Sequence, residues 1–293
     1  QGIPIDSENT PLHIVTDAAG SLTRETAWRY GITLLDSYII AGDQSRPESL
    51  YSSAEIYPLM RQGIKITTAQ ASTFERQQHY HNICRQFGPS LYLAVGSAFT
   101  GNYDAALSWK KEHDPEDIFQ VIDTGAASGR LALIALQTAR FAAKAGSAKA
   151  VLKYAAEMIE CCEEFVFIHE LKYLVAGGRV SRTGGFFGDL LSMKPIISPT
   201  RSGVKKVGIV RSTEGQLRFA VEKAAQRYQS AAPSVIMLQY SDNHSWVEEK
   251  VEPQIRKILP QAEILLAPLS LTSGVHMGPG AWSMALAFPE HGR

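Results

Sequence analysis

The sequence predicts an α/β protein with two domains. In the first half, short apolar runs alternate with loops and helical segments, which is typical of a parallel sheet covered by helices. After residue 162 the order changes, because two adjacent strand segments joined by a turn interrupt the alternation and indicate a mixed sheet. The length of 293 residues also exceeds what one hydrophobic core usually serves.

The first half contains three apolar runs that are typical of buried strands. They cover residues 12–17, 90–96 and 118–124. Helical segments are predicted at 25–30, 54–62, 72–88, 102–114 and 127–146. Ser72 and Glu75 form a capping box at the start of the third helix. This order predicts an open sheet of the Rossmann or flavodoxin type, in which ligands bind beyond the carboxyl ends of the strands.

The second half predicts a mixed α+β sheet. A strand at 164–170 is followed by a short helix and the loop "AGGRVSR". Residues 194–211 form a predicted hairpin with a turn at Ser202 and Gly203. The remaining segments are helices at 214–230 and 246–259 and strands at 234–241, 262–270 and 281–288. We therefore predict domains at 12–162 and 163–289, with residues 1–11 as a linker or an expression remnant.

Composition indicates a soluble cytoplasmic protein. The chain is 45% hydrophobic and 20% charged, which is ordinary for a globular protein, and no apolar run approaches the ~18 residues of a membrane span. No basic and apolar signal sequence opens the chain. The three cysteines, two of them adjacent, suit a reducing compartment and lack the spacing of a zinc site. A formal net charge of zero argues against a nucleic-acid-binding protein.

One stretch of the chain is strongly basic. Residues 172–211 hold eight Lys and Arg residues, and Asp189 is the only acid among them. Such a stretch attracts an anionic partner such as a phosphate, an acidic protein surface or an anionic membrane in transient contact. The alternative is a solvated face that acids from elsewhere in the fold balance.

Small hydroxyl residues follow the first-half strands. The segments are "AAGSLT" at 18–23, "TTAQAS" at 67–72 and "GSAFTGN" at 96–102. In a parallel sheet these loops share one edge, where hydroxyl and N–H groups can bind a carboxylate or phosphate. The alternative is ordinary helix capping, which suits Ser72 best.

Residues 274–280 read "GVHMGPG". Three glycines and a proline predict a tight loop that brings His276 close to a small anionic group. The alternative is a turn that happens to contain a histidine.

Motifs of the common catalytic classes are absent from the sequence. It has no Gly-x-Ser-x-Gly elbow, no Gly-x-Gly-x-x-Gly and no Walker A pattern. His79 and His81 are two residues apart on a predicted helix and do not share a face, so we expect no metal site. A lipid hydrolase or acyltransferase that uses Ser97 and His276 is the rival prediction, although no acid is placed to orient the histidine.

These segments together resemble the DegV family of bacterial fatty-acid-binding proteins. The resemblance runs from about Ile14 to Ala287, and "LKYLVAGGRVSR", "LLSMKPII" and "GVHMGPG" carry it most specifically. "IVTDAAGSL", "TTAQAS", "GSAFTGNYDAA" and "VIDTGAASG" are similar to other family segments. Ala18, Ala19, Ala69, Ala71, Gly96 and Asn102 depart from the family pattern.

The resemblance implies a non-catalytic carrier without cofactor or metal. One long-chain fatty acid such as palmitate, stearate or oleate would lie buried between the domains. Its carboxylate would be offered to an ATP-dependent fatty acid kinase, either a separate subunit or a domain fused upstream. A sensor of lipid occupancy is a further alternative.

The resemblance also implies roles for particular residues. Thr68 and Ser97 would hold the carboxylate, Thr100 lies in the same loop, and His276 would sit near the head group; the choice between Ser97 and Thr100 stays open. The loop backbone would come from Gly101, Gly278 and Gly280. Arg179 and Arg211 fall where the family places basic residues used with the kinase.

Overall fold

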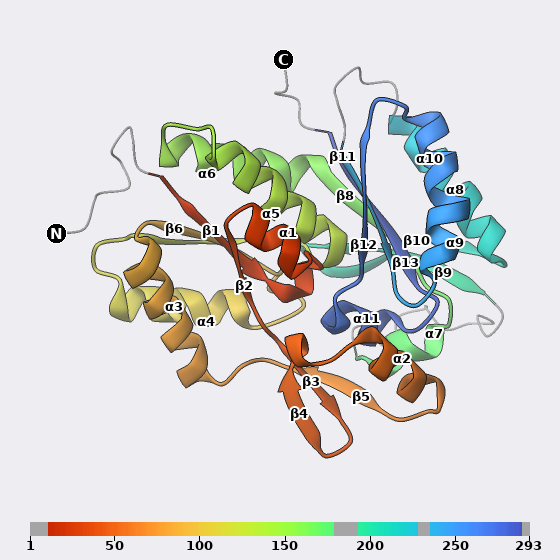
Figure 1. The fold of residues 1–293 in the computed structure, drawn as a ribbon, viewed down its shortest axis with the longest axis horizontal. Helices are drawn as coiled ribbons and strands as arrows, with labels where there is room; N and C mark the ends of the chain where they lie inside the picture. Colours follow the sequence, from red (N-terminus) through yellow and green to blue (C-terminus); the bar gives the residue numbers. More distant parts are fainter. Residues whose placement is uncertain (1–10, 179–192, 228–234, 289–293) are drawn as a thin grey trace.

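The computed structural model describes residues 11–178, 193–227 and 235–288, whose strands form three sheets (Figure 1). The parallel sheet has the order β2-β1-β6-β7, and the mixed sheet has the order β10-β9-β8-β13-β11-β12. The small sheet is antiparallel, with the order β4-β3-β5.

The parallel sheet consists of β1 (His13–Asp17), β2 (Ile32–Leu35), β6 (Ser90–Ala94) and β7 (Phe119–Asp123). The mixed sheet consists of β8 (Cys162–Phe167), β9 (Lys194–Thr200), β10 (Gly203–Val210), β11 (Val235–Tyr240), β12 (Glu263–Pro268) and β13 (Trp282–Ala287). The small sheet consists of β3 (Tyr38–Ala41), β4 (Gln44–Pro47) and β5 (Ile66–Ala69).

Helices cover and separate the sheets. The long ones are α3 (Thr73–Phe87), α4 (Asn102–His113), α5 (Ser128–Ala142), α6 (Ala148–Cys161) and α8 (Thr213–Arg227). The shorter ones are α1 (Arg24–Arg29), α2 (Ser53–Arg61), α7 (Leu171–Ala176), α9 (His244–Trp246), α10 (Glu252–Ile258) and α11 (Leu271–Met277). A π-helical segment, Val247–Val251, connects α9 to α10.

Helix α5 lies between the two large sheets, as the alternating side chains of their strands show. In β6, Leu91 and Leu93 pack in the same cluster as α5, whereas Tyr92 and Ala94 pack toward α3 and α4. In β13, Ala285 faces α5 and Met284 faces the cluster that contains α8 and α10. The layers therefore run from α3 and α4 through the parallel sheet, α5 and the mixed sheet to α8 and α10 (Figure 1).

The middle of helix α5 is apolar on every side, and sheets flank it. Each residue from Leu131 to Leu136 is fully buried, and the helix contacts β1 and β6 as well as β8, β11 and β13. A helix without a polar face is stable only in such a position.

A carboxylate from the mixed sheet caps the N-terminus of α5. Glu164 on β8 is fully buried and accepts hydrogen bonds from the backbone N–H groups of Gly129 (3.0 Å) and Arg130 (3.1 Å). The residue that precedes the helix, Ala127, supplies no side-chain cap. Burial raises the pKa of Glu164, while hydrogen bonds, including those from the two N–H groups, oppose the shift. The contact satisfies otherwise orphaned donors and aligns a negative charge with the positive end of the helix dipole.

Gly129 permits this contact. A Cβ atom at Gly129 would lie 2.8 Å from Oε1 of Gln239 and 3.1 Å from Oε1 of Glu164. The helix therefore approaches the mixed sheet more closely than a larger residue allows.

The predicted fold class is confirmed. The parallel sheet, the mixed sheet and the hairpin between β9 and β10 are all present. The proposed boundary near residue 163 stays a prediction, and residues 1–10 and 289 lie outside the described part. Among the described residues, no helix is both long and apolar enough to cross a bilayer.

Two local predictions are wrong. Residues 67–69 do not form a loop at the edge of the parallel sheet, because they belong to β5 of the small sheet, where Thr68 pairs with Ile39. Residues 274–277 do not form a loop either, because they complete α11, which ends at Gly278. Glycine lowers helix propensity, but packing against neighbouring elements overrides that preference here.

We expect Glu164→Ala to lower the free energy of unfolding by about 3 kcal/mol or more, because it leaves two buried N–H donors without an acceptor. Urea denaturation measures the change. Glu157→Ala on α6 is the control, since its 3.7 Å pair with Lys153 lies on the surface and is worth less than about 0.5 kcal/mol. A loss at Glu164 no larger than at Glu157 would contradict the capping role.

Candidate functional site

A cavity lies where the small sheet, the parallel sheet and the mixed sheet meet. Its volume, taken as the space open to the centre of a water molecule, is about 140 Å³. β5, α11, the loop after β6, the start of α5 and strands β8, β9 and β10 all contribute to its walls.

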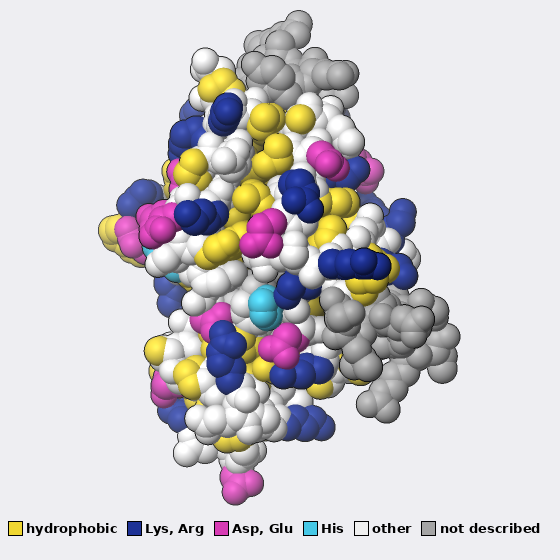
Figure 2. All heavy atoms as spheres, turned by 90° about the vertical axis from the view of Figure 1, so that its right-hand side faces the viewer, with side chains coloured by type: hydrophobic (Ala, Val, Ile, Leu, Met, Phe, Trp, Pro, Cys, Tyr) yellow, Lys and Arg dark blue, Asp and Glu magenta, His cyan; other side chains and the backbone are white. Residues whose placement is uncertain are grey.

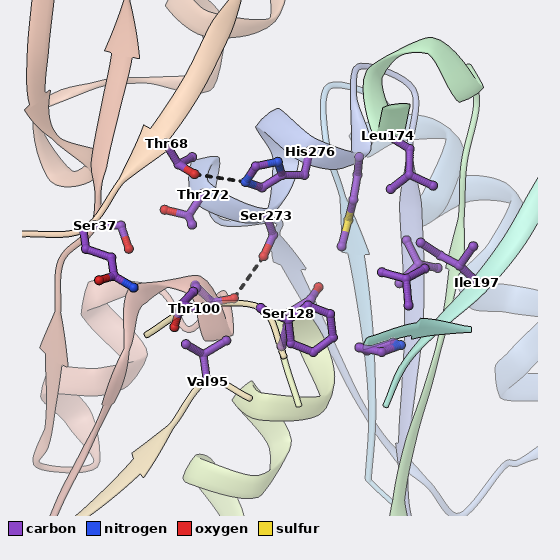
Figure 3. Close-up of a pocket in the computed structure, with 18 of the residues that line it drawn as sticks. Ser37, Thr68, Val95, Thr100, Ser128, Leu174, Ile197, Thr272, Ser273 and His276 are labelled. Atoms are coloured by element: carbon purple, nitrogen blue, oxygen red, sulfur yellow. Dashed lines mark hydrogen bonds between the residues drawn. The ribbon is translucent and has the colours of Figure 1, made fainter. Parts of the chain in front are cut away.

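The lining has a polar side and an apolar side. Figure 3 shows Ser37, Thr68, Thr100 and Thr272 on one side and Leu174 and Ile197 on the other. The apolar lining residues are Ala19, Ala69, Val95, Phe99, Ala127, Val166, Leu174, Ile197, Pro199, Val204 and Met277. The polar ones are Ser37, Thr68, Gln70, Thr100, Ser128, Thr272, Ser273 and His276. Among the described residues, no Asp, Glu, Lys or Arg lines the cavity. The site therefore suits a largely apolar molecule with one polar end.

Helix α11 brings three of the polar side chains into the cavity. His276 comes four residues after Thr272 and three after Ser273, so it shares a helix face with each of them. The helix begins where the Ser270 side chain accepts from the backbone N–H of Ser273 (3.1 Å).

Glu48 fixes the start of α11 from another part of the chain. Its carboxylate accepts from the N–H groups of Leu271 (2.7 Å) and Thr272 (3.2 Å) and from the Thr272 hydroxyl. Burial raises the pKa of Glu48, and these hydrogen bonds oppose the shift. The charge is thereby kept behind the cavity wall, while the hydroxyl and imidazole groups of α11 line it.

Thr68 and His276 meet across the cavity wall. Oγ1 of Thr68 lies 3.0 Å from Nε2 of His276, although the residues are 208 positions apart (Figure 3). The donor depends on the imidazole tautomer. Gly177 lies against the other side of the ring, since a Cβ there would be 2.5 Å from Nδ1. The small sheet, α11 and the end of α7 therefore fix the ring together.

The glycines of "GVHMGPG" allow close packing of α11. A Cβ at Gly274 would lie 2.1 Å from Oη of Tyr57 on α2. Gly278, with φ +86°, ends the helix, and a Cβ there would lie 2.3 Å from Cδ2 of Tyr173. This packing explains the unusual composition around His276.

Asp17 holds the loop after β6 in place. Its carboxylate accepts from the N–H of Val95 (2.7 Å), the hydroxyl of Tyr92 (2.8 Å) and Nδ2 of Asn102 (2.9 Å). Burial raises the pKa of Asp17 to about 6, and the three hydrogen bonds oppose the shift. Because Val95 and Asn102 flank the loop, these bonds position Phe99 and Thr100 on the cavity wall.

The structure brings together three of the four predicted head-group residues. Thr68, Thr100 and His276 line the cavity. Ser97 is exposed and does not line it, and both its N–H (3.0 Å) and its hydroxyl (2.6 Å) donate to the carboxylate of Asp123. Its role in carboxylate binding stays a prediction, and its hydroxyl is not directed to His276.

The other predicted residues lie around the cavity or outside the described part. Gly101 packs beside Gln70, and Gly278 and Gly280 have positive φ after α11. Arg211 is exposed just after β10, and Arg179 lies outside the described residues.

Acids from elsewhere partly balance the basic stretch. Lys172 pairs with Glu170 (2.6 Å), and Arg201 pairs with Glu160 (3.1 Å). Figure 2 shows blue and magenta side chains interspersed over the face on the right-hand side of Figure 1. The described part of this face is therefore of mixed charge.

Several lining residues were not predicted as site residues. Ser37 is separated in sequence from every motif, whereas Ser128 stands inside the segment "VIDTGAASG" and has a positive φ of 51°. Thr272 and Ser273 directly precede the predicted loop, so an amphipathic helical pattern through residue 276 would have indicated them. Gln70 stands inside the segment "TTAQAS", but a neutral amide in a loop gives no local signal of a binding role.

Comparison with known proteins extends over nearly the whole chain. A family model described as "uncharacterised protein, DegV family" matches residues 11–288. A DegV domain-containing protein of Caldanaerobacter subterraneus is 25% identical over 269 residues, which cover 92% of this chain and 95% of the relative.

Solved structures share the fold. DegV of Bacillus subtilis, described as a fatty acid binding protein, gives a TM-score of 0.85 at 18% identity and covers 95% of this chain and 99% of its own. A DegV family protein of Thermus thermophilus, described by its fatty acid binding, gives 0.85 at 21% identity with the same coverage. A stearic-acid-binding protein of Eubacterium ventriosum gives 0.84 at 19% identity and covers 94% and 98%.

The contact between Gly274 and Tyr57 allows a double-mutant test of how α11 is placed. We expect Gly274→Ala to lower the free energy of unfolding by about 1–3 kcal/mol, although alanine favours helix, because its Cβ overlaps the Tyr57 hydroxyl. Within the described chain that buried hydroxyl has no hydrogen-bond partner, so Tyr57→Phe should cost little.

Thermal and urea unfolding of both single variants and the double variant measure the coupling. When Tyr57→Phe is added to Gly274→Ala, the free energy of unfolding should rise by at least about 1 kcal/mol. Strictly additive effects would show that this contact does not set the position of the helix.

Proposed function

The chain belongs to the DegV family, and from that premise we propose that its cavity binds one long-chain fatty acid, such as palmitate, stearate or oleate. In this proposal the carboxylate is then presented to an ATP-dependent fatty acid kinase, which converts it to an acyl phosphate. The observation that carries the proposal is a cavity with an apolar side, a side rich in neutral hydroxyl groups and no charged residue among the described lining.

The apolar side supplies the affinity. A buried chain of about 14 to 16 carbons gains roughly 0.8 kcal/mol per methylene, or about 12 kcal/mol before the costs of binding. That gain suffices for tight binding without an ion pair. The head group then needs only enough hydrogen bonds to offset its desolvation.

The polar side has hydroxyl donors available for a carboxylate. Within the part of the chain that the structure describes, the Ser37 hydroxyl has no protein acceptor, and Oγ1 of Thr100 only accepts, from the N–H of Asn102 (3.3 Å). Thr68 and His276 lie next to them on the same side (Figure 3). Neutral donors hold a carboxylate less tightly than an Arg pair does, which leaves its oxygen more reactive toward a phosphoryl group.

A carrier fits these contacts better than a hydrolase. A serine nucleophile needs a base within hydrogen-bond reach, whereas the Ser97 hydroxyl donates to Asp123 and the imidazole of His276 lies on Thr68. Cys84, Cys161 and Cys162 are free thiols, which supports a cytoplasmic location.

Mass spectrometry tests lipid binding directly. Protein purified from cells and denatured should release one long-chain fatty acid per chain.

Val204→Trp, which fills part of the apolar side, should weaken oleate binding about tenfold or more, since each methylene that loses its contact costs roughly 0.8 kcal/mol. Lys205→Trp is the matched control, because neighbouring strand residues point to opposite faces and Lys205 is exposed. Absence of any bound lipid, or equal losses in both variants, would contradict the proposal.

The kinase step has its own test. We expect His276→Ala to reduce acyl-phosphate formation by a fatty acid kinase much more than it reduces oleate affinity. The reason is that the imidazole can hydrogen-bond the acid or the arriving phosphoryl group, whereas the apolar contacts remain. Lipid titration and a coupled assay of ADP release measure the two effects, and equal losses would count against this role of His276.

A further inference from the structure

A second, smaller chamber lies behind the polar side of the lipid cavity. Ser37 and Gln70 line both spaces. The chamber has a volume of about 10 Å³, close to what one water molecule requires. Its walls also include Asp17, Arg76, Tyr80, Tyr92 and Asn102.

The chamber encloses a carboxylate that the proposed function does not use. Asp17 is 1% exposed. The groups that face it are the hydroxyl of Tyr92 on β6, the amide of Asn102 on α4 and the charge of Arg76 on α3. The other titratable side chains of the chamber are Asp36 after β2 and His79 and Tyr80 on α3.

Two buried polar atoms of the chamber lack partners. Among the described residues, neither Oη of Tyr80 nor Nε of Arg76 has a hydrogen-bond partner, although Tyr80 is only 1% exposed. Arg76 and Tyr80 are four residues apart on α3 and share a face. Unpaired buried polar groups are usually satisfied by water, so one water that connects them to Asp17 fits the size of the space.

Asp17 is separated from the lipid cavity by a single residue. The backbone N–H of Val95 donates to Asp17 (2.7 Å), while Val95 itself lines the lipid cavity. Gln70 forms a second link, because its Oε1 accepts from Nη1 of Arg76 (2.5 Å) and it lines both spaces. A lipid carboxylate at the polar side would therefore lie close to a second, buried carboxylate.

We propose that Asp17 takes up a proton from solvent when a fatty acid carboxylate binds in the neighbouring cavity, so that the chamber is a proton site linked to lipid binding. The inference rests on the proposed function. Two nearby like charges in a buried region disfavour ionisation, and protonation removes one of them. The proton converts the Asp17 carboxylate to a carboxylic acid, and the lipid stays ionised.

Thermodynamic linkage between lipid binding and protonation of Asp17 sets the direction in which lipid affinity changes with pH. Burial already raises the pKa of Asp17 to about 6 without ligand, and a bound anion raises it further. Because coupling is reciprocal, protonation must favour lipid binding to the same extent. The affinity for an ionised fatty acid should therefore fall as the pH rises from about 6 to 8.

Proton uptake tests the proposal directly. A pH indicator in weakly buffered solution at pH 7 should report roughly 0.5 to 1 proton taken up per oleate bound to the wild-type protein. Oleyl alcohol has the same chain without a charge and should give no uptake. Asp17→Asn should abolish the proton uptake that accompanies oleate binding, and Asp104→Asn, at an exposed acid on α4, should leave that proton uptake unchanged.

Affinity measurements give an independent readout. Oleate binding to the wild-type protein should weaken about tenfold between pH 6 and 8, and binding to Asp17→Asn should change less than about twofold. Equal uptake with oleate and oleyl alcohol, or no uptake at all, would overturn the proposal from the wild-type protein alone, even if the variant fails to fold. Oleate binding without proton uptake contradicts only this inference, whereas no binding at either pH contradicts the proposed function.

Discussion

The fold depends on one buried contact, the carboxylate of Glu164 against the N-terminus of α5. Both large sheets contact helix α5, and its apolar surface is buried from solvent between them. Glu164 fixes the helix on the mixed sheet at the end where Ala127 and Ser128 line the cavity. The same contact that holds the layers together therefore sets one wall of the candidate site.

The opposite wall depends on a second carboxylate at a helix start. Glu48 stands between β4 and α2 in the chain, and its carboxylate holds the first residues of α11. Gly274 lets α11 lie against Tyr57, so the helix that carries Thr272, Ser273 and His276 is fixed from two sides. Preorganised polar groups lose little entropy when a ligand arrives.

Charge is arranged in a layer behind the cavity rather than on its surface. Asp17 and Glu48 both position lining residues through backbone N–H groups, and neither lines the candidate cavity. The described part of the lining holds no charged residue, which favours an apolar chain, since burying an unpaired charge beside it would be costly. The groups behind the wall still act on a bound anion through the low-dielectric interior, which is why ligand binding and the ionisation of Asp17 are coupled in our proposal.

The sequence by itself determined the fold class and the mixed second sheet, and it pointed to three residues that line the candidate cavity, because strand and helix periodicity and short motifs are local signals. Thr68, Thr100 and His276 stand inside such motifs and line the cavity. Only the tertiary structure decided that Thr68 lies on a separate antiparallel sheet and that His276 belongs to a helix, since both depend on contacts between residues far apart in sequence. It also decided that Ser97 turns to Asp123 and that Ser37 enters the cavity, because the direction of a loop side chain follows from its neighbours in space.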